Sequence, residues 1–491
     1  MDEKELTKLK SAYEAAGQGH VFECLADLSE DETASLLEQL KGIEVDKLSN
    51  LLQSALNEQK SDSSDITSFS KKVAQVNDNT DEQITKSREA GLDAIKNGEV
   101  AALVLSGGQG TRLGFNGPKG MYNIGMPSGR SLFQMISERI TKLSQLASSS
   151  SPEKGDKDSE PDAKKQKVDD SARSIPWYIM TSPINHNETE EYFKSNSYFG
   201  LPSDSVMLFQ QGMLPCLTND GKIIMETPSK VSMAPDGNGG IYPSMVKAGA
   251  LDDMKKRGIK YLHVFSIDNA LVKPADPIFM GYCIKEGADC GNKVLWKSHA
   301  HEKVGVMAEK SGKPCIVEYS DITTEMAEKT DDDGRLVFGA GNICNHFYTI
   351  DFIDKVVLPN MSDMYHVARK KIPFYDQDKK ETVTPAANNG IKLETFIFDV
   401  FPLSKSMAVL DVNREEEFAP VKNAPGAASD SPDTARGLMS SLSKKWVIEA
   451  GGNLVGEKDS NSCEVSPLTS YAGEGLDKLV KGKDIECPFS V

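Results

Sequence analysis

The chain lacks the features that mark several large classes of protein. No apolar run approaches the ~20 residues that a helix needs to span a bilayer. The first residues, Met1-Asp2-Glu3-Lys4, also lack the apolar core of a signal peptide. The eight cysteines are scattered and include no Cys-x-x-Cys pair, which favours reduced thiols over a disulfide framework. These absences predict a soluble, cytoplasmic protein.

An excess of basic residues is lacking as well. The 491 residues include 56 Lys and Arg against 73 Asp and Glu, which gives a formal net charge of −17 at pH 7. Binding to nucleic acid or to an anionic membrane needs a cationic face, so we expect neither as a partner. A small anionic ligand, held by a few local cations, remains compatible with this charge.

The apolar pattern divides the chain into three parts. Residues 1–95 show helical spacing, and residues 96–401 alternate short apolar strands, such as 101–105 and 261–267, with amphipathic helices. Residues 402–491 hold the apolar stretches 408–412 and 446–448 among Gly- and Pro-rich turns. We expect a helical N-terminal region, a central α/β domain and a small C-terminal domain that contains β-strands. The polar residues 147–174 predict a disordered insertion in the central domain.

A glycine-rich loop is the most informative stretch. The apolar residues 100–105 lead into Leu105-Ser106-Gly107-Gly108-Gln109-Gly110-Thr111-Arg112-Leu113-Gly114, and Pro118-Lys119 follows. A helix is expected behind the loop, because Ser131 and Gln134 match a capping box ahead of an apolar stripe. Glycines let backbone N–H groups approach a phosphate closely, and Arg112 and Lys119 add two cations. The loop therefore predicts a polyphosphate site between a strand and a helix.

Three kinds of phosphate loop compete for this assignment. A Walker A loop needs Gly-x-x-x-x-Gly-Lys-[Ser/Thr], which does not occur in the chain. A dinucleotide loop needs Gly-x-Gly-x-x-Gly, whereas Gly108-x-Gly110-x-x-x-Gly114 is one residue too long. The two cations favour the third kind, a loop that binds a nucleoside triphosphate from which pyrophosphate must leave.

The loop and several later strings resemble one family. The pattern Leu105-x-x-Gly108-x-Gly110-Thr111 with Pro118-Lys119 resembles the signature of nucleotidyltransferases that make UDP-sugars. Further strings resemble eukaryotic UDP-N-acetylhexosamine pyrophosphorylases, namely those at 210–215, 231–240, 317–320, 341–343, 389–392 and 470–475. The resemblance runs from about residue 98 to 480, apart from the insertion. It implies a Rossmann-like nucleotidyltransferase fold, with a mixed sheet flanked by helices.

The family resemblance also implies a reaction. The phosphate of N-acetylglucosamine 1-phosphate attacks the α-phosphorus of UTP, pyrophosphate leaves, and Mg²⁺ (or Mn²⁺) assists. The attacking phosphate is already an anion, so the enzyme has to bring two anions together rather than supply a strong base. A UDP-glucose or broad-specificity UDP-sugar pyrophosphorylase is the alternative, and an inactive nucleotide-sugar sensor is another. We expect a monomer or a homodimer.

The resemblance assigns roles to individual residues. It implies Arg112, Lys119 and Lys422 as catalytic cations. The implied UTP site comprises Leu105, Ser106, Gly107, Gly108, Lys119, Gln211, Gly237, Asp268 and Lys392. The implied sugar site comprises Asn238, Glu318, Tyr319, Asn342, Phe396, Phe398 and Lys422. Asp268 follows the expected strand 261–267, where a carboxylate can hold Mg²⁺, and Asp399 is a second metal candidate.

Overall fold

The computed structural model describes residues 3–58, 65–71, 73–76, 80–149 and 173–491. The chain forms two compact units, each assembled from separate segments. Unit 1 comprises residues 1–66, 211–244 and 354–403, and unit 2 comprises residues 67–210, 245–353 and 404–491. These limits differ from the predicted boundaries at 95/96 and 401/402. Most of the predicted insertion lies outside the described residues, although residues 147–149 end a helix.

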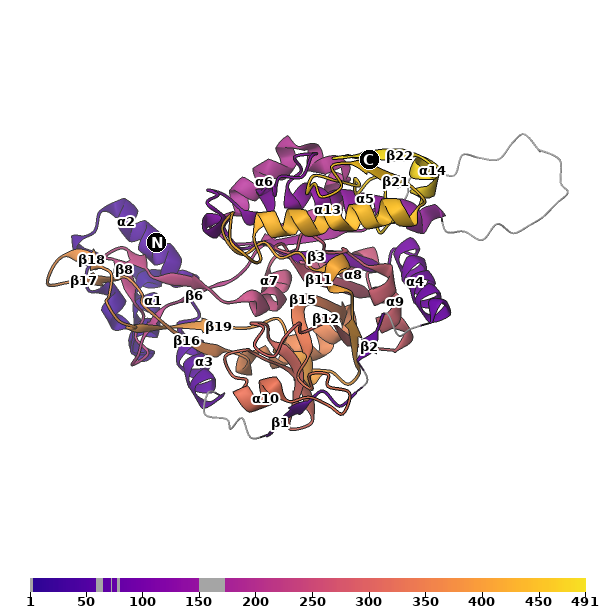
Figure 1. The fold of residues 1–491 in the computed structure, drawn as a ribbon. Helices are drawn as coiled ribbons and strands as arrows, with labels where there is room; N and C mark the ends of the chain where they lie inside the picture. Colours follow the sequence, from indigo (N-terminus) through magenta and orange to yellow (C-terminus); the bar gives the residue numbers. More distant parts are fainter. Residues whose placement is uncertain (1–2, 59–64, 72, 77–79, 150–172) are drawn as a thin grey trace, which may run out of the picture. The chain divides into compact units, whose positions relative to one another are not determined.

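Unit 2 is built on a mixed sheet with mainly parallel strands, which confirms the predicted fold class (Figure 1). On the main path of the sheet, β15 runs antiparallel to both of its neighbours, β12 and β11. The sheet runs in the order β2 (Ala74–Gln75), β20 (Met407–Asp411), β12 (Cys290–Trp296), β15 (Ala340–Thr349), β11 (Tyr261–Ser266), β3 (Val100–Leu105), β4 (Trp177–Thr181), β5 (Val206–Gln210). A branch consists of β1 (Ile66–Ser68), β13 (Val306–Lys310) and β14 (Lys313–Val317).

Helices cover the sheet and share one large apolar core with it. Strand β3 is buried along its whole length, as expected for a central parallel strand with helices on both faces. Helices α4 and α9 pack against each other. The main helices of unit 2 are α4 (Asp81–Lys96), α5 (Leu132–Ser149), α6 (His186–Ser195), α8 (Ala250–Arg257), α9 (Pro277–Lys285), α10 (Thr324–Glu328), α12 (Arg414–Glu417) and α13 (Pro432–Glu449).

The helix behind the glycine loop begins as predicted, but its capping box is incomplete. The Ser131 hydroxyl accepts from the Gln134 N–H at 3.2 Å. The Gln134 side chain turns forward instead of back, and donates to Glu138 at 2.9 Å. Helix α5 buries the predicted stripe Leu132, Ile136, Ile140 and Leu143.

The C-terminal segment contains strands, as predicted, and one of its two apolar stretches is helical. Strands β21 (Asn453–Gly456) and β22 (Asp484–Cys487) pair in parallel, and helix α14 (Asp477–Val480) lies between them in the chain. Residues 446–448 belong to helix α13 and not to a strand. Ser431 caps this helix and Pro432 opens it, so the signals at its start decide the conformation of the short apolar run.

Unit 1 combines three helices with small sheets. Helix α2 starts at a complete capping box between Ser29 and Glu32. The helices described in unit 1 are α1 (Glu3–Ala15), α2 (Glu30–Lys41) and α3 (Val45–Glu58). The three-stranded sheet of this unit has the order β16 (His366–Lys370), β19 (Gly390–Glu394), β7 (Leu217–Thr218). Two-stranded sheets are β6 (Met213–Pro215) with β10 (Met233–Pro235), β8 (Met225–Thr227) with β9 (Lys230–Val231), and β17 (Phe374–Asp376) with β18 (Glu381–Val383). Helix α7 (Ile241–Lys247) leaves unit 1 for unit 2.

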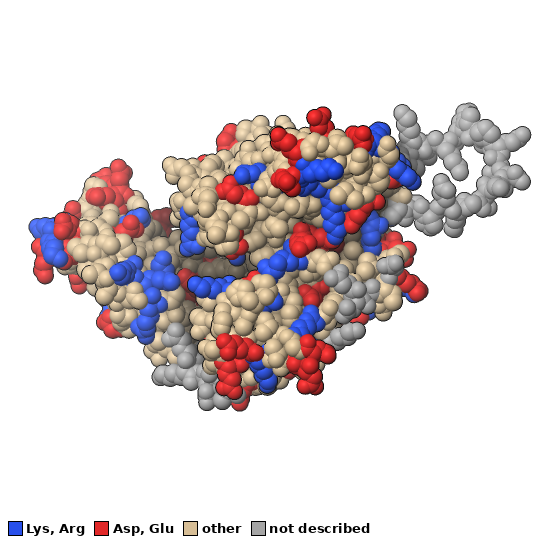
Figure 2. All heavy atoms as spheres, in the orientation of Figure 1, with Lys and Arg blue, Asp and Glu red and all other residues tan. Residues whose placement is uncertain are grey.

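Acidic and basic side chains are interspersed on the face that Figure 2 shows, so the acidic excess forms no single uniform field there. All eight cysteines are free thiols. In the part of the chain that the structure describes, every helix is too short or too polar to cross a membrane.

Candidate active site

The glycine-rich loop lies in unit 2, directly after β3. The N–H of Gly110 donates to the carbonyl of Gly117 at 2.8 Å, and the N–H of Lys119 donates to the carbonyl of Gly108 at 3.2 Å. These bonds fold the loop back on itself. Arg112, in the 3-10 helix η4 (Thr111–Leu113), and Lys119, at the start of η5 (Lys119–Met121), are thereby carried on the loop that leaves β3.

The glycines of the loop have different reasons to be glycine. A Cβ on Gly110 would lie 2.7 Å from the ring of Phe115, and Gly114 has a φ of +71°. Both are needed for the shape of the loop itself. A Cβ on Gly108 would meet no atom within 4 Å, and this residue is exposed. Gly108 is therefore the position where an open backbone suits a phosphate.

Asn185 anchors the first half of the glycine loop through side-chain hydrogen bonds. Its side chain is fully buried at the start of helix α6, and its amide donates to the carbonyls of Ser106 at 3.0 Å and Gly108 at 3.3 Å. Its oxygen accepts from the Ser182 N–H at 2.8 Å. Sequence reasoning missed this residue. The hydroxyl of Ser106 is buried and has no hydrogen-bond partner among the described residues.

The structure brings four predicted charged residues of unit 2 together around Lys119. Burial lowers the pKa of Lys119, the nearby Lys422 and Arg112 lower it too, and Asp268 acts in the opposite direction. Two further cations and one carboxylate within electrostatic reach of Lys119 suit a polyphosphate. At Cys344, burial raises the pKa of the thiol to about 12, Asp268 adds to the rise, and Lys422 opposes it. Cys344 is a neighbour of this cluster that the sequence did not reveal.

Asp268 and Lys422 come from two segments that lie against each other. Asp268 stands two residues after β11, and its carbonyl accepts from the N–H of Val421 at 2.8 Å. The next residue, Lys422, donates its N–H to the carbonyl of Asp430 at 2.7 Å. The Lys422 side chain is exposed, with its ammonium 5.9 Å from the centre of the Phe418 ring.

Two of the predicted sugar-binding residues in unit 2 meet at Gly305. The N–H of Asn342, in β15, donates to the Gly305 carbonyl at 2.8 Å. A Cβ on Gly305 would lie 3.0 Å from a carboxylate oxygen of Glu318, which follows β14. Tyr319 is 52% exposed. The Asn342 oxygen also accepts from the N–H of Cys344, which ties it to the charged cluster.

In unit 1, the predicted residues around Gly237 pack against residues 395–399. Gly237 has a φ of +86°, and a Cβ there would lie 2.2 Å from the Thr395 carbonyl oxygen. The Asn238 side chain accepts from the N–H of Ile397 at 2.9 Å. Glycine at 237 is therefore required by both conformation and close approach. Asn238 uses its side-chain oxygen within the protein.

The remaining predicted residues of unit 1 surround the same loop. Phe396 and Phe398 stack with their ring centres 5.2 Å apart. Asp399 is engaged by its own neighbours, because it accepts from the Phe396 N–H at 2.6 Å and lies 3.0 Å from His366. Burial raises the pKa of Asp399, against the effect of His366. Lys392 lies on β19, and Gln211 precedes Gly212, whose carbonyl accepts from the Asp236 N–H.

Asp236 is a second residue that the sequence reasoning passed over. It is 5% exposed, and one of its carboxylate oxygens has no hydrogen-bond partner among the described residues. A Cβ on Gly240 would lie 2.0 Å from that carboxylate, and one on Gly212 would lie 2.2 Å from it. The two glycines thus make the space that this side chain occupies. Burial raises the pKa of Asp236 to about 6.

The described residues fit a magnesium ion that is held mainly by its substrate. They contain no group of three or more His, Cys, Asp and Glu placed to hold a metal ion. Mg²⁺ commonly takes one or two carboxylates and fills its other positions with phosphate oxygens and water. Asp268 meets that need beside the cations, whereas the Asp399 carboxylate is already bonded to its neighbours.

Comparison with known proteins identifies the family. Residues 45–472 match the family model described as UTP–glucose-1-phosphate uridylyltransferase. The chain belongs to this family. It is 42% identical to UDP-N-acetylglucosamine diphosphorylase 2 of Arabidopsis thaliana, with 97% of this chain and 92% of that protein covered. It is 41% identical to UDP-N-acetylhexosamine pyrophosphorylase-like protein 1 of Xenopus tropicalis, with 97% and 94% covered.

Solved structures agree with this membership of the uridylyltransferase family. The uridine diphosphate N-acetylglucosamine pyrophosphorylase of Trypanosoma brucei, crystallised in complex with an inhibitor, superposes with a TM-score of 0.81 at 32% identity. That match covers 97% of this chain and 95% of the other. The resemblance deduced from the loop and the later strings is therefore confirmed, and so is the fold that it implied.

Proposed function

We propose that this uridylyltransferase makes UDP-N-acetylglucosamine and pyrophosphate from UTP and N-acetylglucosamine 1-phosphate. The observation that carries the proposal is the cluster of Arg112, Lys119, Lys422 and Asp268 at the glycine loop of unit 2. The relative from Arabidopsis thaliana and the structure from Trypanosoma brucei both bear names with N-acetylglucosamine, which favours this sugar.

The proposed mechanism needs no protein nucleophile. The sugar phosphate attacks the α-phosphorus of UTP, a bond forms between its oxygen and that phosphorus, and the bond to pyrophosphate breaks. Lys119 and Arg112 bind the triphosphate, and the guanidinium of Arg112 stabilises the charge on the departing pyrophosphate. Lys422 binds the phosphate of the sugar. The three cations offset the repulsion between two anionic substrates, which is the main barrier to their encounter.

We assign the base and the sugar ring to the other predicted residues. Ser106, Gly107 and Gly108 of unit 2, and Gln211, Gly237 and Lys392 of unit 1, are proposed to contact UTP. The open backbone at Gly108 supports the first group. Asn238, Phe396 and Phe398 of unit 1, and Glu318, Tyr319 and Asn342 of unit 2, are proposed for the sugar.

A magnesium ion completes the proposal. Bound Mg²⁺ neutralises phosphate charge and activates the α-phosphorus, and Asp268 is the residue proposed to hold it. We expect EDTA to abolish pyrophosphate release and added Mg²⁺ to restore it. Full activity in EDTA would contradict the role of Asp268. We place the enzyme in the cytoplasm as a monomer or a homodimer.

The name of the family model keeps a glucose substrate as the second candidate. Pyrophosphate release is the deciding assay, run with UTP and, in turn, the 1-phosphates of N-acetylglucosamine, N-acetylgalactosamine, glucose and galactose. The proposal predicts the highest kcat/KM with N-acetylglucosamine 1-phosphate. A preference for glucose 1-phosphate would overturn it in favour of a UDP-glucose pyrophosphorylase.

A further inference from the structure

Asn269 joins the two segments that carry Asp268 and Lys422. Its side chain is buried between them, and its amide donates to the Glu417 carbonyl at 2.6 Å. Its oxygen accepts from the N–H of Ala419 at 2.9 Å and from the N–H of Leu271 at 3.1 Å. One side chain thus satisfies backbone groups of both segments, residues 268–276 and 417–422, over a sequence separation of 148 residues.

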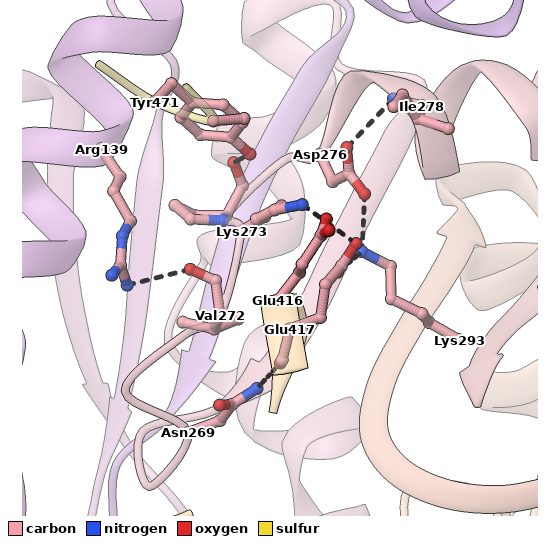
Figure 3. Close-up of polar contacts among 12 residues, drawn as sticks. Arg139, Asn269, Val272, Lys273, Asp276, Ile278, Lys293, Glu416, Glu417 and Tyr471 are labelled. Atoms are coloured by element: carbon pink, nitrogen blue, oxygen red, sulfur yellow. Dashed lines mark hydrogen bonds and ion pairs between the residues drawn. The ribbon is translucent and has the colours of Figure 1, made fainter. Parts of the chain in front are cut away.

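A closed set of buried charges lies beside Asn269 (Figure 3). Lys293, in the middle of β12, is fully buried and donates to Asp276 at 2.6 Å and to Glu417 at 2.5 Å. Lys273 adds a contact to Glu417 at 3.3 Å. Burial would lower the pKa of Lys293, but the two carboxylates hold it above its ordinary value. Two cations and two anions therefore compensate one another in the interior.

Segment 268–276 has side-chain anchors besides Asn269 that come from α5 and from Tyr471. The buried Arg139 of α5 donates to the carbonyls of Ala270 at 2.8 Å and Val272 at 3.1 Å. Tyr471 donates to the carbonyl of Pro274 at 3.1 Å. If Asn269 were removed, these contacts would still fix the segment of Asp268. The segment of Lys422 would lose its side-chain bond to Asn269 and keep the ion pair of Glu417 with Lys293 and its backbone bonds.

We propose that Asn269, together with the Lys293–Asp276–Glu417 charges, positions Lys422 relative to Asp268 for uridylyl transfer. The inference rests on the proposed function, in which Lys422 binds the sugar phosphate. Lys422 has an exposed and flexible side chain, so the place of its ammonium depends on where its backbone is held. A displacement of about 1 Å at a reacting group can cost about 100-fold in rate. Asn269 is thus a positioning residue that acts through Lys422.

A double-mutant cycle tests this inference. Asn269→Ala is expected to lower kcat/KM for N-acetylglucosamine 1-phosphate by about 10- to 100-fold, and to change it by less than about threefold in a Lys422→Ala background. Ser440→Ala is the matched control, because the buried Ser440 of α13 also bonds two backbone groups of a distant loop, at Ser460 and Cys463. It is expected to have little effect in both backgrounds. Equal losses from Asn269→Ala in both backgrounds would show a merely structural role and overturn the inference.

A second readout does not depend on activity. Trypsin cleaves after lysine, so cleavage after Lys422 reports how firmly residues 417–422 are held. We expect cleavage after Lys422 to be at least about tenfold faster in Asn269→Ala than in the wild type or in Ser440→Ala. Unchanged cleavage after Lys422 would overturn the inference that Asn269 positions this segment. A wild type that resists cleavage but makes no UDP-sugar would instead overturn the proposed function.

Glu417→Gln is a second variant, for the case in which Asn269→Ala does not fold. It keeps the shape of the side chain and removes one buried charge that Lys293 contacts. Faster cleavage after Lys422 and a loss of kcat/KM that disappears in Lys422→Ala are again expected. A loss of the same size in both backgrounds would count against the inference.

Discussion

At the scale of single residues, Arg112 carries the strongest prediction. It is exposed on η4, and within the described residues no ion pair engages its guanidinium. Arg112→Ala is expected to lower kcat by about 100-fold or more, the usual scale for the loss of one electrostatic stabiliser of the transition state. Arg88→Ala, on the exposed face of α4, is the matched control and should leave kcat within about twofold. Near-normal turnover by Arg112→Ala would remove it from the mechanism.

Asp236 gives a prediction about stability and pH. Its folded pKa is about 6 against an ordinary value of 3.8, so above pH 6 the folded state carries the full cost of a buried carboxylate. This cost is about 3 kcal/mol and is relieved as pH falls from about 6 to 4. Asp236→Asn, which does not titrate, should therefore melt at a higher temperature than the wild type at pH 7.5. Thermal unfolding should show the gap closing at pH 4.5, and a lower melting temperature at pH 7.5 would contradict this account.

Single residues differ in how far the sequence reveals them. Arg112 and Lys119 could be predicted because their role depends on a loop that is local in sequence. The roles of Asn185 and Asn269 depend on partners 77 to 150 residues away, which only the fold brings near. Asp236 stands inside a string that carried the family resemblance, yet its burial against Gly212 and Gly240 is a property of packing.

At the scale of elements, the support beneath the glycine loop can be tested through helix α6. Asn185→Ala removes the donor to the carbonyls of Ser106 and Gly108 and the acceptor of the Ser182 N–H. Gly108 keeps its bond from the Lys119 N–H, so the Ser106 carbonyl and the Ser182 N–H are the groups that lose their partner. A loss of about 1–3 kcal/mol per unpaired group predicts a fall in kcat/KM for UTP of about tenfold or more. Asn196→Ala, at the exposed end of the same helix, is the control. Equal UTP kinetics for the two variants would exclude a role for Asn185.

Elements with a strong local pattern were predicted correctly. Strand β3 is six apolar residues in a row, which fits a buried strand. Helix α5 has an apolar stripe behind a serine cap, which fits an amphipathic helix. Residues 446–448 were too few to show a period. Their conformation is set by the start of α13 fifteen residues earlier, where Ser431 caps the helix.

At the scale of the whole molecule, the two units could not be read from the sequence. The chain enters unit 1 three times, so that helices α1–α3 share a core with residues such as Leu217 and Ile391. The predicted domains follow the order of the sequence, so residues 211–244 and almost all of 354–403 were expected in the central domain. The predicted site residues are likewise divided, with Gln211, Gly237 and Lys392 in unit 1 and the cluster at Lys119 in unit 2.

The central claim is that the intact chain transfers the uridylyl group of UTP to a sugar phosphate. The most direct measurement follows label from [α-³²P]UTP and [γ-³²P]UTP in the presence of N-acetylglucosamine 1-phosphate and Mg²⁺. The account predicts α-label in UDP-N-acetylglucosamine and γ-label in pyrophosphate, at matching rates. Release of labelled UMP without a UDP-sugar, or binding of UTP without any transfer, would contradict it.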